Sequence, residues 1–138
     1  MYHLEGGDQT NYLDANGNVI REEDESGRVI WEYTYDSDGR QIKRVWHGSD
    51  GFVVTTTSAY DANGNIVKEV ETDNEGGEGT TTYQYKLDAN GNATQITRRT
   101  ENRYGDFTYS YTTVTDYRYV DSFDLGIIWI DYYYPETF

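Results

Sequence analysis

The residue types that could perform acid–base or metal chemistry are few in this sequence. There are two histidines, His3 and His47, and no cysteine. His47 lies close to Ser49 and Asp50, but adjacent residues of a turn do not meet the geometry of a catalytic triad, whose side chains must converge. Neither a helical His-Glu-x-x-His pair nor a Gly-x-Ser-x-Gly elbow is present. We therefore expect no catalytic residue, no metal site and no cofactor.

Carboxylates, by contrast, are abundant. Asp and Glu number 25 against 11 Lys and Arg, which gives a net charge of -14. A glycosidase pair could be drawn from almost any two of them, so the sequence singles out none. A calcium loop of the EF-hand type needs Gly at its sixth position and Glu at its twelfth. Counted from Asp36, glycine is fourth and His47 is twelfth. The acidic balance also argues against nucleic acid or an anionic membrane as partner.

The composition favours a folded β-protein. Aromatic residues make up 16% of the chain, and 15 of its residues are Tyr. Tyr and Thr favour the pleated, half-buried surface of a sheet. No apolar run approaches the roughly 18 residues of a membrane span. The length predicts a single domain over residues 1–138. No secretory leader precedes Tyr2, which is compatible with a cytoplasmic chain or with one whose leader has been removed.

One short motif, Asp-x-x-Gly followed by Asn or Arg, recurs along the chain. Its clearest copies begin at Asp14, Asp36, Asp61 and Asp88. Weaker turn signals lie between them. One glycine from each turn gives the series Gly17, Gly27, Gly39, Gly51, Gly64, Gly77, Gly91 and Gly105. Short strands separated by turns at such intervals indicate an all-β sandwich or barrel.

The motif predicts a hairpin turn by a local mechanism. The aspartate side chain accepts a hydrogen bond from the backbone two residues later, and glycine takes the left-handed conformation that a Cβ would penalise. A three-residue loop with a glycine bulge fits this pattern. If Asp pairs with the residue after Gly, Tyr35 lies opposite Gln41. The same register places Glu32 opposite Arg44.

These turns predict an antiparallel up-and-down meander of about ten strands, curled into a closed or nearly closed barrel. The last segment, apolar on both faces, would close the barrel against the N-terminal strand around Tyr12, and Pro135 would end it. An open curved sheet is the alternative. The expected strands span residues 9–13, 18–24, 28–36, 40–47, 52–60, 65–72, 80–87, 92–100, 106–120 and 127–134.

The repeated motif resembles the YD repeat of Rhs-type proteins, and it is similar to the Tyr-rich repeats of bacterial surface lipoproteins. The best copies are Tyr33-Thr34-Tyr35-Asp36-Ser37-Asp38-Gly39-Arg40 and Tyr60-Asp61-Ala62-Asn63-Gly64-Asn65. The match covers about residues 12 to 98, and two copies have Leu where Tyr would stand. The resemblance implies strips of β-hairpins, and contacts with proteins or carbohydrates at the cell surface. It also implies an extracytoplasmic location, although a cytoplasmic one is not excluded.

Alternation of side chains predicts which face is the interior. We expect the interior face to carry Leu13, Val19, Trp31, Tyr33, Tyr35, Val45, Tyr60, Ile66, Val70, Tyr83, Tyr85 and Leu87. Arg21, Lys43 and Lys68 fall on the same face, each four residues after a turn glycine. Their side chains would extend toward solvent with their stems on apolar surface.

Two functions are compatible with this interpretation. The first is a non-catalytic structural or interaction domain of the bacterial cell envelope, acting as a monomer or an edge-paired dimer. The second is a binder of a sugar or an anion inside a Tyr-lined barrel, because aromatic rings beside polar groups suit such ligands. The residues expected to contact the ligand are Trp31, Tyr33, Tyr35, Lys43, Tyr60, Lys68, Tyr83 and Tyr85.

Overall fold

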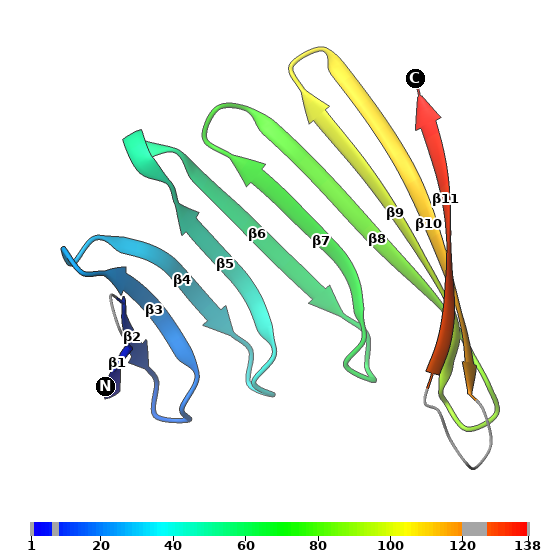
Figure 1. The fold of residues 1–138 in the computed structure, drawn as a ribbon, viewed down its shortest axis with the longest axis horizontal. Helices are drawn as coiled ribbons and strands as arrows, with labels where there is room; N and C mark the ends of the chain where they lie inside the picture. Colours follow the sequence, from blue (N-terminus) through cyan, green and yellow to red (C-terminus); the bar gives the residue numbers. More distant parts are fainter. Residues whose placement is uncertain (1, 7–8, 120–126, 138) are drawn as a thin grey trace.

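The chain folds into one antiparallel β-sheet (Figure 1). This computed structural model describes residues 2–6, 9–119 and 127–137, and it places side chains over residues 9–117. Within these residues eleven strands follow one another in chain order, each paired with its sequence neighbours. The strands are β1 (Tyr2–Gly6), β2 (Gln9–Leu13), β3 (Val19–Asp24), β4 (Val29–Tyr35), β5 (Gln41–His47), β6 (Val53–Tyr60), β7 (Ile66–Asp73), β8 (Gly77–Leu87), β9 (Ala93–Tyr104), β10 (Phe107–Tyr119) and β11 (Ile127–Thr137).

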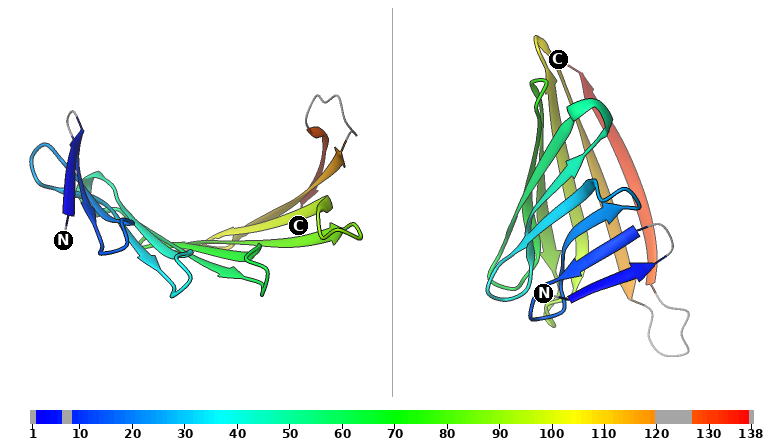
Figure 2. Two further views of the ribbon diagram at one scale, coloured as in Figure 1. Left: turned by 90° about the horizontal axis from the view of Figure 1, so that it is seen from below. Right: turned by 90° about the vertical axis from the view of Figure 1, so that its left-hand side faces the viewer.

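The meander is confirmed, but the predicted barrel is wrong. β11 pairs with β10, and both edges of β2 are occupied, one by β1 and the other by β3. The edge around Tyr12 is therefore not available to β11. The sheet is curved, but β1 and β11 stay at opposite ends of it (Figure 2). The open curved sheet is the correct alternative.

The last strand departs from the sequence prediction in a second way. Pro135 does not end it, because β11 continues to Thr137 and Pro135 lies opposite Tyr111 of β10. Proline lacks a backbone donor and is tolerated on an edge strand, where one side of the backbone needs no partner. The predicted burial of Ile127 to Ile130 on both faces lies outside the residues whose side chains are described.

A hydrophobic interior is not formed by the described side chains. None of the hydrophobic ones among them is buried, and those that are buried belong to Thr56, Thr100 and Ser110. The expected interior face therefore has no second layer over it. A single sheet leaves both faces without a covering layer, so its aromatic side chains are only half-buried.

The register of the β4–β5 hairpin begins as predicted and then shifts by one residue. Tyr35 lies opposite Gln41, but a bulge follows, and Glu32 lies opposite Val45 instead of Arg44. The bulge inserts one unpaired residue into β5, which reverses the parity of every later position in that strand. The same shift occurs after the turns into β3, β7 and β9.

The bulges decide which residues share a face. Tyr33 and Trp31 lie opposite Arg44 and Trp46. We call the face that carries Trp31, Tyr33, Tyr35, Tyr60, Tyr83 and Tyr85 the tyrosine face. In β4, β6 and β8 its residues are more covered than those that alternate with them. By alternation and register, the predicted members Val45 and Val70, and the cations Arg21, Lys43 and Lys68, lie on the opposite face.

Candidate functional site

The Asp-x-x-Gly turns of the hairpins are built by the contacts that the sequence predicted. Each motif aspartate accepts hydrogen bonds through Oδ1 from the backbone N–H groups two and four residues later. At Asp36 these come from Asp38 and Arg40, both at 2.9 Å. The glycine N–H also donates to the aspartate carbonyl, at 3.1 Å for Gly39. The same pair of side-chain contacts occurs at Asp14, Asp24, Asp61, Asp73 and Asp88.

These donors favour the charged form of the aspartates. The Ser26 hydroxyl and then the Arg28 backbone N–H hold the pKa of Asp24 at about 2, below its ordinary value of 3.8. The pKa of Asp36 is also lowered, first by the backbone N–H of Arg40. The Oδ1 atoms of the turn carboxylates are thus engaged by the backbone of their own turns.

Three tyrosines tie each hairpin to the preceding one. Tyr35 donates its hydroxyl hydrogen to the carbonyl of Val19 at 2.7 Å. Tyr60 donates to Gln41 at 2.7 Å, and Tyr85 donates to the Ile66 carbonyl at 2.5 Å. Each acceptor is the first residue of the neighbouring strand that leaves the preceding turn. The tyrosines therefore join neighbouring hairpins at the end of the sheet that carries the turns at Asp14, Asp36 and Asp61. At this end no turn connects one hairpin to the next.

Two further tyrosines are paired with carboxylates. The hydroxyl of Tyr33 donates to Glu22 at 3.0 Å, and that of Tyr83 donates to Glu69 at 2.8 Å. Burial, and then the hydrogen bond to Glu69, raises the pKa of Tyr83 to about 12. Burial and Glu22 raise the pKa of Tyr33 in the same way. Both phenols stay neutral donors at any physiological pH.

The tyrosine face brings together six of the eight residues expected to contact a ligand. Trp31 and Tyr33 stack, with ring centroids 5.9 Å apart and planes 10° apart. Tyr83 and Tyr85 alternate along β8. Lys43 and Lys68 are exposed on the opposite face, so they do not belong to this group. The bulges in β5 and β7 place these two lysines on the face opposite the tyrosine face.

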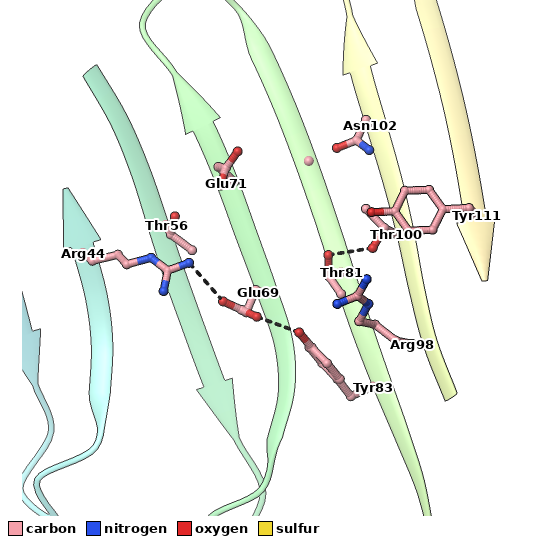
Figure 3. A pocket seen from close by; sticks show the side chains of 11 residues that line it. Arg44, Thr56, Glu69, Glu71, Thr81, Tyr83, Arg98, Thr100, Asn102 and Tyr111 are labelled. Atoms are coloured by element: carbon pink, nitrogen blue, oxygen red, sulfur yellow. Dashed lines mark hydrogen bonds and ion pairs between the residues drawn. The ribbon is translucent and has the colours of Figure 1, made fainter. Parts of the chain in front are cut away.

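The structure adds a polar groove that the sequence did not reveal. It runs across β5 to β10 on the tyrosine face, has a volume of about 250 Å³ and is lined by residues that include Arg44, Glu69, Glu71, Tyr83, Arg98 and Asn102 (Figure 3). Only Tyr83 among these was expected at a site. The predicted register, with Glu32 opposite Arg44, contains no bulge, whereas the bulges in β5 and β7 bring Arg44 and Glu69 to the tyrosine face. A register that includes one bulged residue after the turns into β5 and β7 would have found both.

Other chemistry is sparse in the described residues. His47 Nε2 lies 2.7 Å from Glu32 Oε2, an interaction that joins β4 to β5 on the opposite face. The described part of the chain contains no group of three His, Cys, Asp or Glu residues placed to hold a metal ion. Among the same residues, no helix has the length and apolar character that crossing a membrane requires.

Comparison with known proteins supports the interpretation of the turns. None of the curated proteins compared with the chain matches it significantly. The family model of the RHS repeat matches residues 14–45, from the first motif turn to the middle of β5. The predicted resemblance to the YD repeat is therefore confirmed over this stretch of the chain, which is similar to the RHS repeat.

Proposed function

We propose that this chain is a non-catalytic structural or interaction domain of the bacterial cell surface, and that the tyrosine face is its contact surface. The observation that carries the proposal is the open sheet itself. Its described side chains bury no hydrophobic residue, while Trp31 and Tyr33 stack on a face that no second layer covers. Half-buried aromatic side chains on a face without a covering layer are typical of an interaction surface.

The RHS repeat at residues 14–45 supports the location, because RHS repeats are typically associated with the cell surface. The geometry also supports a structural role. Turn aspartates and tyrosine hydroxyls are engaged by neighbouring backbone groups, so the conspicuous side chains of the motif hold the hairpins together. The carboxylate and hydroxyl groups of the motif are therefore engaged in hydrogen bonds that hold the fold, as expected for a domain that does not catalyse a reaction.

The alternative of a sugar or anion held inside a barrel loses its basis. Such a site requires a lumen, and the sheet does not close. A ligand would have to bind on a face of the sheet.

The location is tested on intact cells of the bacterium that makes the protein. An antibody against the domain should label unbroken cells, and protease added outside should remove the label. Labelling that requires lysis would contradict a surface location.

The contact surface is tested by a matched pair of variants in β4. Tyr33→Ser removes a ring from the tyrosine face, and Thr34→Ser changes the adjacent exposed residue on the opposite face. We expect the washed cell envelope to retain less of the Tyr33→Ser protein and the wild-type amount of Thr34→Ser. The comparison is made at a temperature at which both variants keep the wild-type circular dichroism. Equal retention of the two would contradict the proposal.

A further inference from the structure

The outer edge of β11 has no neighbouring strand among the described residues. β11 pairs along its whole length with β10, and it is the last strand of the sheet. The strand at the other end, β1, has five residues against eleven in β11 (Figure 1). An edge strand presents a row of backbone donors and acceptors with which another strand can pair. The β11 edge of the sheet therefore offers a place for a further strand.

Most of the features that prevent edge pairing are absent from β11. Natural edge strands are protected by short length, by Lys residues, by bulges or by Pro. Residues 127–137 contain no Lys or Arg, and the pairing of β11 with β10 runs without a register shift. Of these protective features, β11 has only Pro135. The strand is thus open to a partner over the residues that precede this proline.

The hairpin between β9 and β10 shows which backbone groups of β11 face outward. Tyr104 and Phe107 close a two-residue turn, and the residues that flank such a turn form a hydrogen-bonded pair. Because hydrogen-bonded pairs alternate along a ladder, the odd-numbered residues of β10 face β9 and the even-numbered ones face β11. The continuous β10–β11 register pairs even with even and odd with odd. The odd-numbered residues of β11 therefore direct their backbone N–H and C=O groups away from β10.

Pro135 agrees with this assignment, because it is odd-numbered and its missing N–H costs no hydrogen bond to β10. The outward-facing residues that precede it are Ile127, Trp129, Asp131 and Tyr133. These four positions are symmetric about residue 130. If a second copy of β11 lies antiparallel with its residue 130 opposite the first, each of the four meets another of the four.

This register also avoids two unfavourable pairings. Asp131 lies opposite Trp129 of the second copy, so the two aspartates do not face each other, and Pro135 falls outside the ladder of residues 127–133. Centring the pair on residue 131 instead would place Asp131 opposite Asp131 and would bring Pro135 into the ladder. Like charges directly opposite each other destabilise a sheet, and a proline removes a ladder hydrogen bond.

A second copy of this chain is the partner that uses the edge most completely. Two identical antiparallel edges are related by a two-fold axis, so both are filled and the assembly closes as a dimer. Pairing of β11 with β1 of another copy would match eleven residues with five. It would also leave a free edge at each end and so generate an open chain of copies.

We propose that this protein forms a two-fold dimer through the outer edges of β11, with residue 130 at the axis, so that two open sheets become one continuous sheet. The inference goes beyond the proposed function, because edge pairing leaves both faces of the sheet uncovered. If the chain is monomeric while Tyr33→Ser lowers envelope retention, the contact surface stands and the dimer fails. If the dimer forms while Tyr33→Ser is retained normally, the dimer stands and the contact surface fails.

Light scattering after gel filtration measures the mass of the full chain as a function of concentration. Each copy carries a net charge of -14, so the salt concentration is set at about 0.15 M, at which repulsion is screened beyond about 8 Å. We expect the mass to rise toward twice the monomer value, with Kd on the order of 0.1 mM or below. A chain that stays monomeric at protein concentrations well above this Kd would overturn the proposal.

Two proline variants test whether the outer edge of β11 makes the contact. Asp131→Pro removes an outward N–H inside the proposed ladder, and Thr137→Pro removes an equally outward one beyond it. We expect no dimer from Asp131→Pro and wild-type association from Thr137→Pro. The comparison is made at a temperature at which both variants keep the wild-type circular dichroism. A dimeric Asp131→Pro chain would contradict pairing at this edge.

Single cysteines locate the axis, and they decide the matter even if a proline variant fails to fold, because the chain has no cysteine of its own. Two copies of Ile130→Cys would form a non-hydrogen-bonded pair with Cα atoms about 4.5 Å apart, within the range of a disulfide. Two copies of Ile128→Cys would be separated by the rise of four residues, about 14 Å, which is too far for a disulfide.

With oxidised glutathione as the oxidant, we expect Ile130→Cys to give a disulfide-linked dimer on a non-reducing gel and Ile128→Cys to remain monomeric on it. Absence of the cross-link at residue 130, or equal cross-linking of the two variants, would contradict the proposed dimer.

Discussion

At the scale of the residue, each hairpin turn depends on an aspartate and a glycine that act on the same backbone. The aspartate supplies the acceptor, and the glycine supplies a φ that other residues adopt at a cost. Gly39 and Gly64 have φ of 81° and 84°. Tyrosines preceding two of these turns, Tyr35 and Tyr60, then donate to the adjacent hairpin. The Tyr-Asp pair therefore links a turn to its neighbour as well as forming it.

Gly39→Ala should destabilise the domain by about 1–2 kcal/mol, because alanine is strained in the left-handed conformation. No atom lies within 4 Å of the added Cβ, so the effect would come from the backbone alone. Urea denaturation measures it. The control is Ser37→Ala, an exposed position in the same turn. An unchanged midpoint for Gly39→Ala would show that the turn does not need its positive φ.

Tyr60→Phe should cost about 0.5–1.5 kcal/mol, because it removes one hydrogen bond and leaves the ring in place. The lost partner is the Gln41 carbonyl. Tyr104→Phe is the matched control, since Tyr104 is 52% exposed and its hydroxyl makes no hydrogen bond within the described residues. Equal urea denaturation midpoints for Tyr60→Phe and Tyr104→Phe would show that the Tyr60 hydroxyl does not stabilise the contact between hairpins.

At the scale of the element, a hairpin is a turn with two strands whose register the bulge sets. The bulge sends Lys43 to one face and Arg44 to the other, and it repeats after the turns into β3, β7 and β9. Arg44, Glu69 and Tyr83 meet across β5, β7 and β8 only because of it. The turn chemistry and the polar groove thus have a common origin.

The turns should make the domain acid-sensitive. The pKa of Asp24 is lowered to about 2 in the folded state, against an ordinary value of 3.8. Its stabilising contribution is therefore complete above the unfolded pKa and is lost as the pH falls through about 2. We expect the free energy of unfolding to fall across this window, and to fall less in Asp24→Asn.

Urea denaturation at several pH values between neutral and about 2 checks this prediction. Asp106→Asn is the control, because Asp106 is exposed and its side chain makes no hydrogen bond among the described residues. Identical pH profiles for wild type and Asp24→Asn would mean that the turn contacts of Asp24 do not contribute to folding.

At the scale of the whole molecule, the fold is an open sheet that hairpins extend one after another. Contacts form between neighbouring strands, and the two ends of the sheet do not meet. This arrangement gives the chain a wide face and no enclosed interior in the described residues. The arrangement favours contact with an extended partner over enclosure of a small one.

Small-angle X-ray scattering distinguishes the open sheet from a closed one. A compact domain of 138 residues has a radius of gyration of about 14 Å. We expect a clearly larger value in dilute solution, because the strands lie side by side in one curved layer. A value at the compact estimate would indicate closure or a covering layer.

The local features of this chain follow from its sequence. Among the positive-φ glycines are Gly17, Gly27, Gly39, Gly51, Gly64, Gly91 and Gly105, all expected as turn residues, while the turn at Asp73 uses Gly76 instead of the expected Gly77. The glycines of the Asp-x-x-Gly turns are predictable because all the hydrogen bonds of such a turn lie within five consecutive residues. The strand β1, which no such motif adjoins on either side, was not predicted.

The global features were decided by tertiary structure. One bulged residue reverses the faces of a strand, so Val45 and Val70 leave the tyrosine face and Arg44 and Glu69 join it. Closure depends on whether β11 can reach a free edge near Tyr12, and β1 occupies that edge. Turn residues specify how each hairpin folds. The face on which a residue lies, and whether the sheet closes, depend instead on the registers of many strands together. The turns could therefore be read from the sequence, whereas the groove and the open sheet required the assembled structure.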